Sequence, residues 1–124
     1  MTVREVLKMG DSRLLQCAEP VADVNSPEIR ALIDDMFDTM RVYSGVGLAA
    51  PQIGLPLHVI VFAVQQNSRY PDAPEVPQTV LINPQITVLD ESLEYAWEGC
   101  LSLPGLRGCA GSAGIGQTPV CYKL

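Results

Sequence analysis

The segment from Ser26 to Val42 carries the spacing of an amphipathic helix, and it limits the folds open to this chain. Ser26 is a typical N-cap residue, Pro27 suits the first helical position, and Glu28 adds an early acid. Apolar residues then recur at helical spacing, at Ile29, Leu32, Ile33, Met36, Phe37 and Met40. The pattern predicts one long helix from about Pro27 to Val42.

Strand-like segments follow this helix. Residues 57–64 are rich in β-branched side chains and predict a buried strand, and shorter strands are predicted at 80–82, 85–89 and 93–97. Residues 65–78 combine prolines with polar neighbours, which is typical of an exposed loop. This order favours an α+β domain, with the helix packed on antiparallel strands, over alternating βαβ units.

Length and charge narrow the function classes. A chain of 124 residues can bury one core. The formal charge of -6 argues against direct binding to nucleic acid, which needs clustered basic residues. No apolar run approaches the length of a membrane span, and the charged first residues do not resemble a signal peptide. We therefore expect a cytoplasmic protein, with its four cysteines reduced because they show no Cys-x-x-Cys pair.

The composition changes near Gly108. All fourteen acidic residues lie at or before Glu98, whereas residues 108–116 are glycine, alanine and serine with one isoleucine and one cysteine. The sequence therefore predicts one domain over residues 1–108 and an irregular Gly/Ala/Ser-rich tail over residues 109–124.

Residues 45–52, Gly-Val-Gly-Leu-Ala-Ala-Pro-Gln, form the first of two motifs. The spacing Gly-x-Gly-x-x-Ala also fits a loose dinucleotide-binding pattern, but that pattern needs a strand before it and a helix after it. Here a helix precedes the motif, and Pro51 and Pro56 prevent a regular helix after it. A simpler interpretation is a tight turn whose Leu48, Ala49 and Ala50 pack into the core.

The second motif is Glu98-Gly99-Cys100-Leu101-Ser102. Together and in this order, the two motifs resemble the peptide deformylase family, and the resemblance covers about residues 3–108. The family removes the formyl group from the first methionine of new polypeptides. It uses a divalent metal held by the cysteine of the second motif and by two histidines of a later His-Glu-x-x-His helix.

The resemblance implies roles for individual residues. Cys100 corresponds to the thiolate ligand of Fe2+, Zn2+ or Ni2+. The Gln52 amide and the backbone N–H of Leu101 correspond to the groups that stabilise the oxyanion formed during the reaction. N-formyl-methionyl peptides are the implied partners, with substrate-binding residues at Val46, Gly47, Leu48 and Arg107. Glu98 is expected to hold its loop by hydrogen bonds.

The third family motif has no counterpart in this chain. His58 is the only histidine, and it lies in a predicted strand. Cys109 and Cys121 could add thiolates, but their spacing matches no common zinc site. We therefore interpret the chain as truncated or frame-shifted, without the C-terminal metal-binding helix, and expect it to be inactive or weakly active.

Other functions stay open. One is a non-catalytic remnant that binds peptides or acts as an interaction module. Another is a hydrolase that uses Cys100 as a nucleophile, although the sequence offers no plausible histidine base. Because a missing helix would leave core surface uncovered, we also expect oligomers or aggregation.

Overall fold

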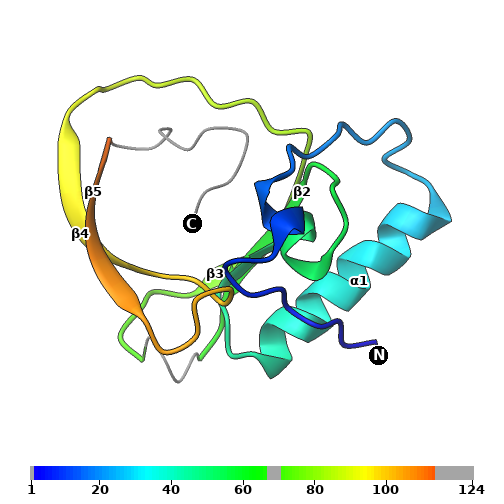
Figure 1. Cartoon of the computed structure of the whole chain (residues 1–124), viewed down its shortest axis with the longest axis horizontal. Coiled ribbons are helices and arrows are strands. Elements are labelled where there is room, and N and C mark those ends of the chain that lie inside the picture. The colour runs from blue at the N-terminus through cyan, green and yellow to red at the C-terminus, as the bar shows by residue number, and fades with distance from the viewer. Residues whose placement is uncertain (1, 67–70, 114–124) are drawn as a thin grey trace.

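The computed structural model describes residues 2–66 and 71–113, with one α-helix and two antiparallel sheets in those ranges (Figure 1). In Figure 1 the larger sheet lies between helix α1 and the smaller sheet. The strands are β1 (Gly47–Ala49), β2 (Val59–Val64) and β3 (Val76–Ile82) in the larger sheet, and β4 (Leu93–Gly99) and β5 (Arg107–Ala113) in the smaller one. The predicted α+β class, with one long helix and antiparallel strands, is confirmed.

Helix α1 spans Pro27–Val42, as the sequence predicts. The Ser26 hydroxyl oxygen accepts a hydrogen bond from the Ile29 N–H at 3.3 Å, so it satisfies one of the free donors at the helix start. The buried face contacts β1 and β2 and forms the core with them. The described part of the chain also forms two 3-10 helices, η1 at Ser12–Leu15 and η2 at Ala50–Ile53.

The N-terminal segment is tied to the buried face of α1. Thr39 is fully buried, and its Oγ1 accepts a hydrogen bond from the Arg4 backbone N–H at 2.8 Å. The Arg4 guanidinium also pairs with Asp35 at 2.7 Å. These contacts position residues 4–9 beside the core, from where they reach the two motif loops.

Strand β2 alternates between buried and half-buried residues, as expected for a strand packed on one face. It begins at Val59, two residues later than the sequence predicts. The backbone N–H of His58 donates to the Glu19 carbonyl at 2.8 Å, and Leu57 forms an isolated parallel bridge with the same residue. His58 therefore lies at a bend before the strand, and its predicted place inside the strand is wrong.

Between residues 65 and 89 the structure differs from two predictions, the exposed loop at 65–78 and the strand at 85–89. Strand β3 begins at Val76, inside the segment predicted as a loop. Residues 85–89, predicted as a strand, form none and are exposed. Asn83 causes this change: its φ of 51° turns the chain, and its side-chain amide exchanges two hydrogen bonds with the Val21 backbone at 2.7 and 2.9 Å.

Strand β5 corrects the predicted start of the irregular tail. Residues 109–113 belong to β5, which pairs with β4 in an unbroken antiparallel register from Leu93↔Ala113 to Gly99↔Arg107. Backbone hydrogen bonding to β4 outweighs the low strand propensity of glycine, alanine and serine. Residues 114–124 of the predicted tail lie outside the described residues.

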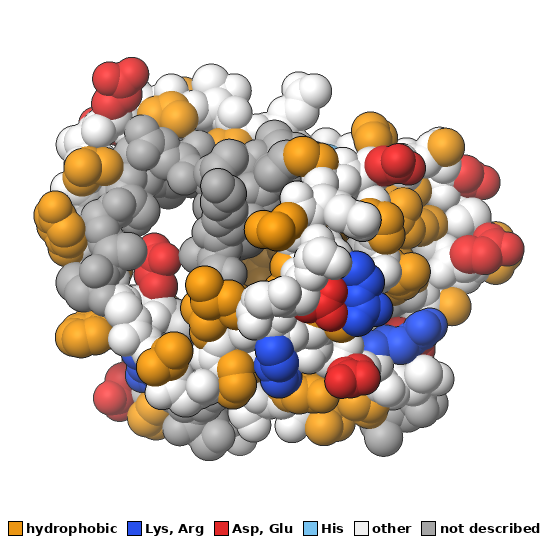
Figure 2. Space-filling view, viewed as in Figure 1, with side chains coloured by type: hydrophobic (Ala, Val, Ile, Leu, Met, Phe, Trp, Pro, Cys, Tyr) orange, Lys and Arg blue, Asp and Glu red, His pale blue; other side chains and the backbone are white. Residues whose placement is uncertain are grey.

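The outer row of β4 is apolar. Leu93, Tyr95 and Trp97 alternate along the strand and are 56%, 75% and 72% exposed. Figure 2 shows hydrophobic side chains at the surface on the side of the molecule where β4 and β5 lie. No helix in the described part of the chain is long and apolar enough to cross a membrane.

Candidate functional site

The first motif bends from a strand into a short helix, and this bend fixes Gln52. The side chains of Leu48 and Ala49, at the end of β1, are buried in the core. Ala50 and Pro51 then begin η2. The Ala49 backbone N–H donates to Gln52 Oε1 at 2.9 Å, so the side chain folds back over the turn. The Gln52 carbonyl accepts a hydrogen bond from the Leu7 N–H at 2.7 Å. Gln52 is thus held by both its backbone and its side chain.

The second motif spans the end of β4 and the start of the loop between β4 and β5. A turn closes when the Leu103 N–H donates to the Cys100 carbonyl at 3.0 Å. Cys100 is half-buried and its thiol is free. Ser102 is 2% exposed, and its carbonyl accepts a hydrogen bond from the Met9 N–H at 2.9 Å. The N-terminal segment therefore ties down both motif loops, through Leu7 and Met9.

The two motifs meet at the Gln52 amide. Gln52 Nε2 lies 3.5 Å from Cys100 Sγ and 3.2 Å from Ser102 Oγ, and it donates to both. The residues are 48 and 50 positions apart in the sequence. The structure thus brings together Gln52 and Cys100, the two side chains to which the sequence assigns chemistry.

A second contact between the motifs is steric. Gly45 is buried, and a Cβ atom built on it would lie 2.6 Å from Leu101 Cδ1 and 3.2 Å from Leu101 Cγ. Leu101 packs against the core from the other motif. The missing side chain at Gly45 therefore makes room for Leu101 and lets the Cys100 loop approach β1.

Gly45→Ala is expected to destabilise the protein by about 1–3 kcal/mol, because Leu101 must move out of its packed position. Urea unfolding followed by circular dichroism measures this change. Gly47→Ala is the matched control, since a Cβ there would meet only ordinary contacts, at 3.7 and 3.8 Å. The double variant Gly45→Ala/Leu101→Ala should lose less stability than the sum of its single variants. Equal effects at Gly45 and Gly47 would contradict the steric explanation.

Gln52, Cys100 and Ser102 line one wall of a cavity of about 500 Å³. Much of the remaining wall is apolar and comes from distant segments, including Leu15, Ala18, Leu57, Val59, Ile60 and Ile86. His58 also lines this cavity and is half-buried. Most of these wall residues belong to no recognisable sequence pattern, because they come together only in the folded chain.

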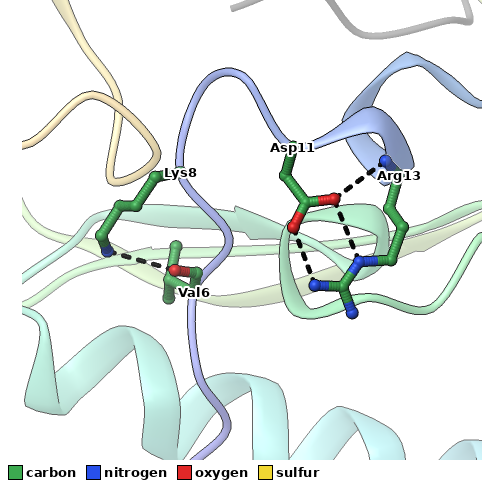
Figure 3. A network of polar contacts seen from close by, with 4 residues as sticks. All are labelled: Val6, Lys8, Asp11 and Arg13. Carbon is green, nitrogen blue, oxygen red and sulfur yellow. Dashed lines mark hydrogen bonds and ion pairs between the residues drawn. The ribbon is translucent and has the colours of Figure 1, made fainter.

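Asp11 is the one acidic residue among the described residues that line the cavity. Its carboxylate accepts hydrogen bonds from the Arg13 guanidinium at 3.0 and 2.8 Å and from the Arg13 backbone N–H at 3.0 Å (Figure 3). The side-chain hydrogen bonds from Arg13 lower the pKa of the Asp11 carboxyl to about 2. Because Asp11 is ionised and paired with Arg13, it is poorly suited to act as a general base near neutral pH. Figure 3 also shows a separate contact, in which Lys8 Nζ donates to the Val6 carbonyl at 3.1 Å.

The predicted substrate-binding residues lie outside this cavity lining. Val46 is half-buried just before β1, and its carbonyl accepts from the Ala63 N–H at 3.0 Å. Gly47 begins β1, and the Leu48 side chain is buried in the core. Arg107 is exposed at the start of β5, opposite Gly99. Glu98, the residue before Gly99 in β4, is half-buried.

The donor groups near Cys100 do not fit a hydrolytic metal centre. Such a centre needs about three protein ligands and one open position. In residues 2–66 and 71–113, no three His, Cys, Asp or Glu side chains lie together as a metal-binding group. Cys17 takes part in a disulfide, so the expectation that all four cysteines are reduced is wrong for Cys17.

Comparisons with known proteins identify similar chains. Residues 3–110 match the family described as Polypeptide deformylase. Peptide deformylase 2 of Ralstonia nicotianae is 61% identical over 106 residues, which is 86% of this chain and 60% of the relative. Peptide deformylase 1 of Bordetella pertussis is 58% identical with the same coverage. This chain therefore spans about 60% of the length of these curated relatives.

Solved structures give the same result for the fold. The Met-Ala-Ser-bound class I type b peptide deformylase from Acinetobacter baumannii aligns with a TM-score of 0.83 and 40% identity, over 90% of this chain and 72% of that one. A peptide deformylase from Legionella pneumophila aligns with a TM-score of 0.75 and 39% identity, over 90% of this chain and 61% of that one.

Proposed function

Because this chain belongs to the polypeptide deformylase family, we propose that its site is built for the N-formyl-methionyl end of a new polypeptide. In the reaction of the family, water adds to the formyl carbon and the C–N bond breaks. The products are formate and a free amine on the methionine. The observation that carries the proposal is the contact between Gln52 Nε2 and Cys100 Sγ, which joins the two family motifs in one site.

Gln52 is the proposed oxyanion donor. Its amide is neutral, is fixed on the Ala49 N–H, and presents Nε2 to Cys100. A fixed donor costs little reorganisation when negative charge develops on the formyl oxygen, which is why such groups lower barriers. The Leu101 backbone N–H, next to Cys100 in the chain, is proposed as the second donor.

We propose the free edge of β1 as the binding surface for the peptide backbone. The Val46 carbonyl and the Ala49 N–H point to opposite sides of β1, towards Ala63 in β2 and towards Gln52. Since neighbouring residues of a strand alternate, the N–H and carbonyl of Gly47 point away from β2. No described strand pairs on that side. An extended peptide can add there as a strand and reach Gln52, with Val46 and Arg107 as flanking contacts.

The chain by itself is proposed to lack turnover. A cysteine thiolate suits Fe2+, Zn2+ or Ni2+, but one thiolate is too few ligands for tight binding. Within the described residues, nothing completes the set around Cys100. The activity proposed here is therefore that of the family, which works in protein biosynthesis in the cytoplasm, and the chain keeps the part of the site that binds and orients the substrate.

A second candidate function is a non-catalytic interaction module. The exposed row of Leu93, Tyr95 and Trp97 favours it, because apolar rows of this kind are typical of surfaces that bind another protein or a second copy. Oligomers formed through this row would agree with the expectation from the sequence. The two candidate functions differ in the strand that binds the ligand. It is β1 for the formyl-methionyl peptide and β4 for the interaction module.

Titration with Met-Ala-Ser, the peptide bound in the Acinetobacter baumannii structure, is expected to move the amide signals of Gly47, Ala49 and Gln52 in a 15N-labelled sample. The reason is that these groups lie along the free edge of β1 and the turn after it. Gly47→Pro removes the edge N–H and should weaken the response, whereas Gly108→Ala, in β5, is the control, since a Cβ atom there would meet nothing within 4 Å. Shifts confined to β4 would instead support the interaction module, and no shift at either strand would contradict both functions.

A further inference from the structure

The Gln52 amide is held from both ends, and this fixes which end is which. A backbone N–H can only donate, so the group that faces the Ala49 N–H at 2.9 Å must be the carbonyl oxygen Oε1. Nε2 therefore faces Cys100 and Ser102. A primary amide has two N–H bonds, and the structure offers one acceptor for each of them.

The two acceptors differ in strength. Sulfur accepts hydrogen bonds weakly, so Cys100 Sγ at 3.5 Å orients the amide poorly by itself. A hydroxyl oxygen is the stronger acceptor, and Ser102 Oγ is also the nearer, at 3.2 Å. Ser102 is 2% exposed, so water cannot easily take its place.

Ser102 is itself held in place. Its carbonyl accepts from the Met9 N–H at 2.9 Å, and the turn that begins at Cys100 closes one residue after it, at Leu103. The Ser102 hydroxyl is therefore held in a fixed position by the backbone, and it does not move along with the Gln52 amide. No buried side-chain polar atom of the described residues lacks a partner.

We propose that Ser102 is the positioning residue of this site. Its hydroxyl takes one N–H of Gln52 and thereby directs the other N–H to the Cys100 side, where the reacting carbonyl is expected. This assignment rests on the proposed function, in which the Gln52 amide stabilises the oxyanion. Ser102 touches no reacting atom and acts only through Gln52.

The test measures how fast the two side-chain N–H protons of Gln52 exchange with water, in the 15N-labelled chain as it stands. Gln52→Met assigns the pair of signals by their loss. Ser102→Ala should speed their exchange by on the order of tenfold, the change expected when one net hydrogen bond is lost. Ser102→Thr keeps the hydroxyl and should restore protection. Ser102→Cys, with a weak acceptor of similar size, should give an intermediate rate and replaces the alanine variant if that does not fold.

Ser26→Ala is the matched control. It also removes a serine hydroxyl that accepts a backbone N–H, at 3.3 Å from Ile29, but it lies at the start of α1. In the Ser26→Ala variant, the side-chain N–H protons of Gln52 should exchange at the same rate as in the unchanged chain. Unchanged exchange in a folded Ser102→Ala or Ser102→Cys variant, or an equal rise in Ser26→Ala, would overturn the positioning role. No turnover, peptide or metal enters this measurement, so a failed Met-Ala-Ser titration would count against the proposed function alone.

Discussion

The chain as it stands is expected to release no formate from formyl-Met-Ala-Ser and to retain only substoichiometric metal after anaerobic purification. Cys100 is the only thiol in the two motifs, and the described residues contain no group of three His, Cys, Asp or Glu side chains that could hold a metal ion. Without a tightly held metal there is no activated water, and the loss of rate should be several orders of magnitude. Formate release and metal content, measured on the same preparation, check both parts.

Peptide deformylase 2 of Ralstonia nicotianae, assayed in parallel, is the positive control for the assay and for the anaerobic handling. Stoichiometric metal together with formate release by this chain would overturn the prediction. That result would mean that residues beyond those described complete the site, and Cys109→Ser and Cys121→Ser variants would then identify whether either of these cysteines takes part.

Grafting the C-terminal part of a relative onto this chain is expected to restore both metal retention and formate release. Residues 111–124 lie beyond the family match, which ends at residue 110. Replacing them with the corresponding C-terminal part of the Ralstonia nicotianae relative should supply the family's His-Glu-x-x-His segment and restore both metal and formate release. The contact between Gln52 and Cys100 would then work in a complete site. The comparison between the chain and its graft isolates what the two motifs can do alone.

Variants of the graft separate the roles of its residues. Gln52→Ala should lower kcat by about a hundredfold or more, the usual cost of one oxyanion donor, with metal retained. Cys100→Ala should abolish metal retention. Gln16→Ala is the matched control, because Gln16 lines the same cavity but belongs to neither motif. A folded, metal-holding graft that is indifferent to Gln52→Ala would show that the oxyanion role is assigned wrongly.

Local signals determined much of the fold. Helix α1 begins and ends where the cap at Ser26 and the apolar spacing predict, since capping and periodicity act within a few residues. The run of β-branched residues around Val61 forms a strand for the same reason. The two motifs were also visible in the sequence, together with Gln52 and Cys100 as candidate site residues.

Tertiary structure decided the pairing and the geometry. Residues 85–89 have high strand propensity but form no strand, because Asn83 turns the chain and ties it to Val21. Residues 109–113 have low propensity but form β5, because β4 offers them a complete row of backbone partners. Strand propensity describes how a residue fits a pleated surface, and only the fold provides that surface.

The site shows the same division. The sequence indicated which residue types the chemistry needs, but not that Ser102 would receive an N–H of Gln52 or that Leu7 and Met9 would hold the two loops. These contacts join residues from 45 to 93 positions apart, and no local pattern records such a distance. They form because burial of the core places three separate segments side by side, and the polar groups left at their edges must then find partners in one another.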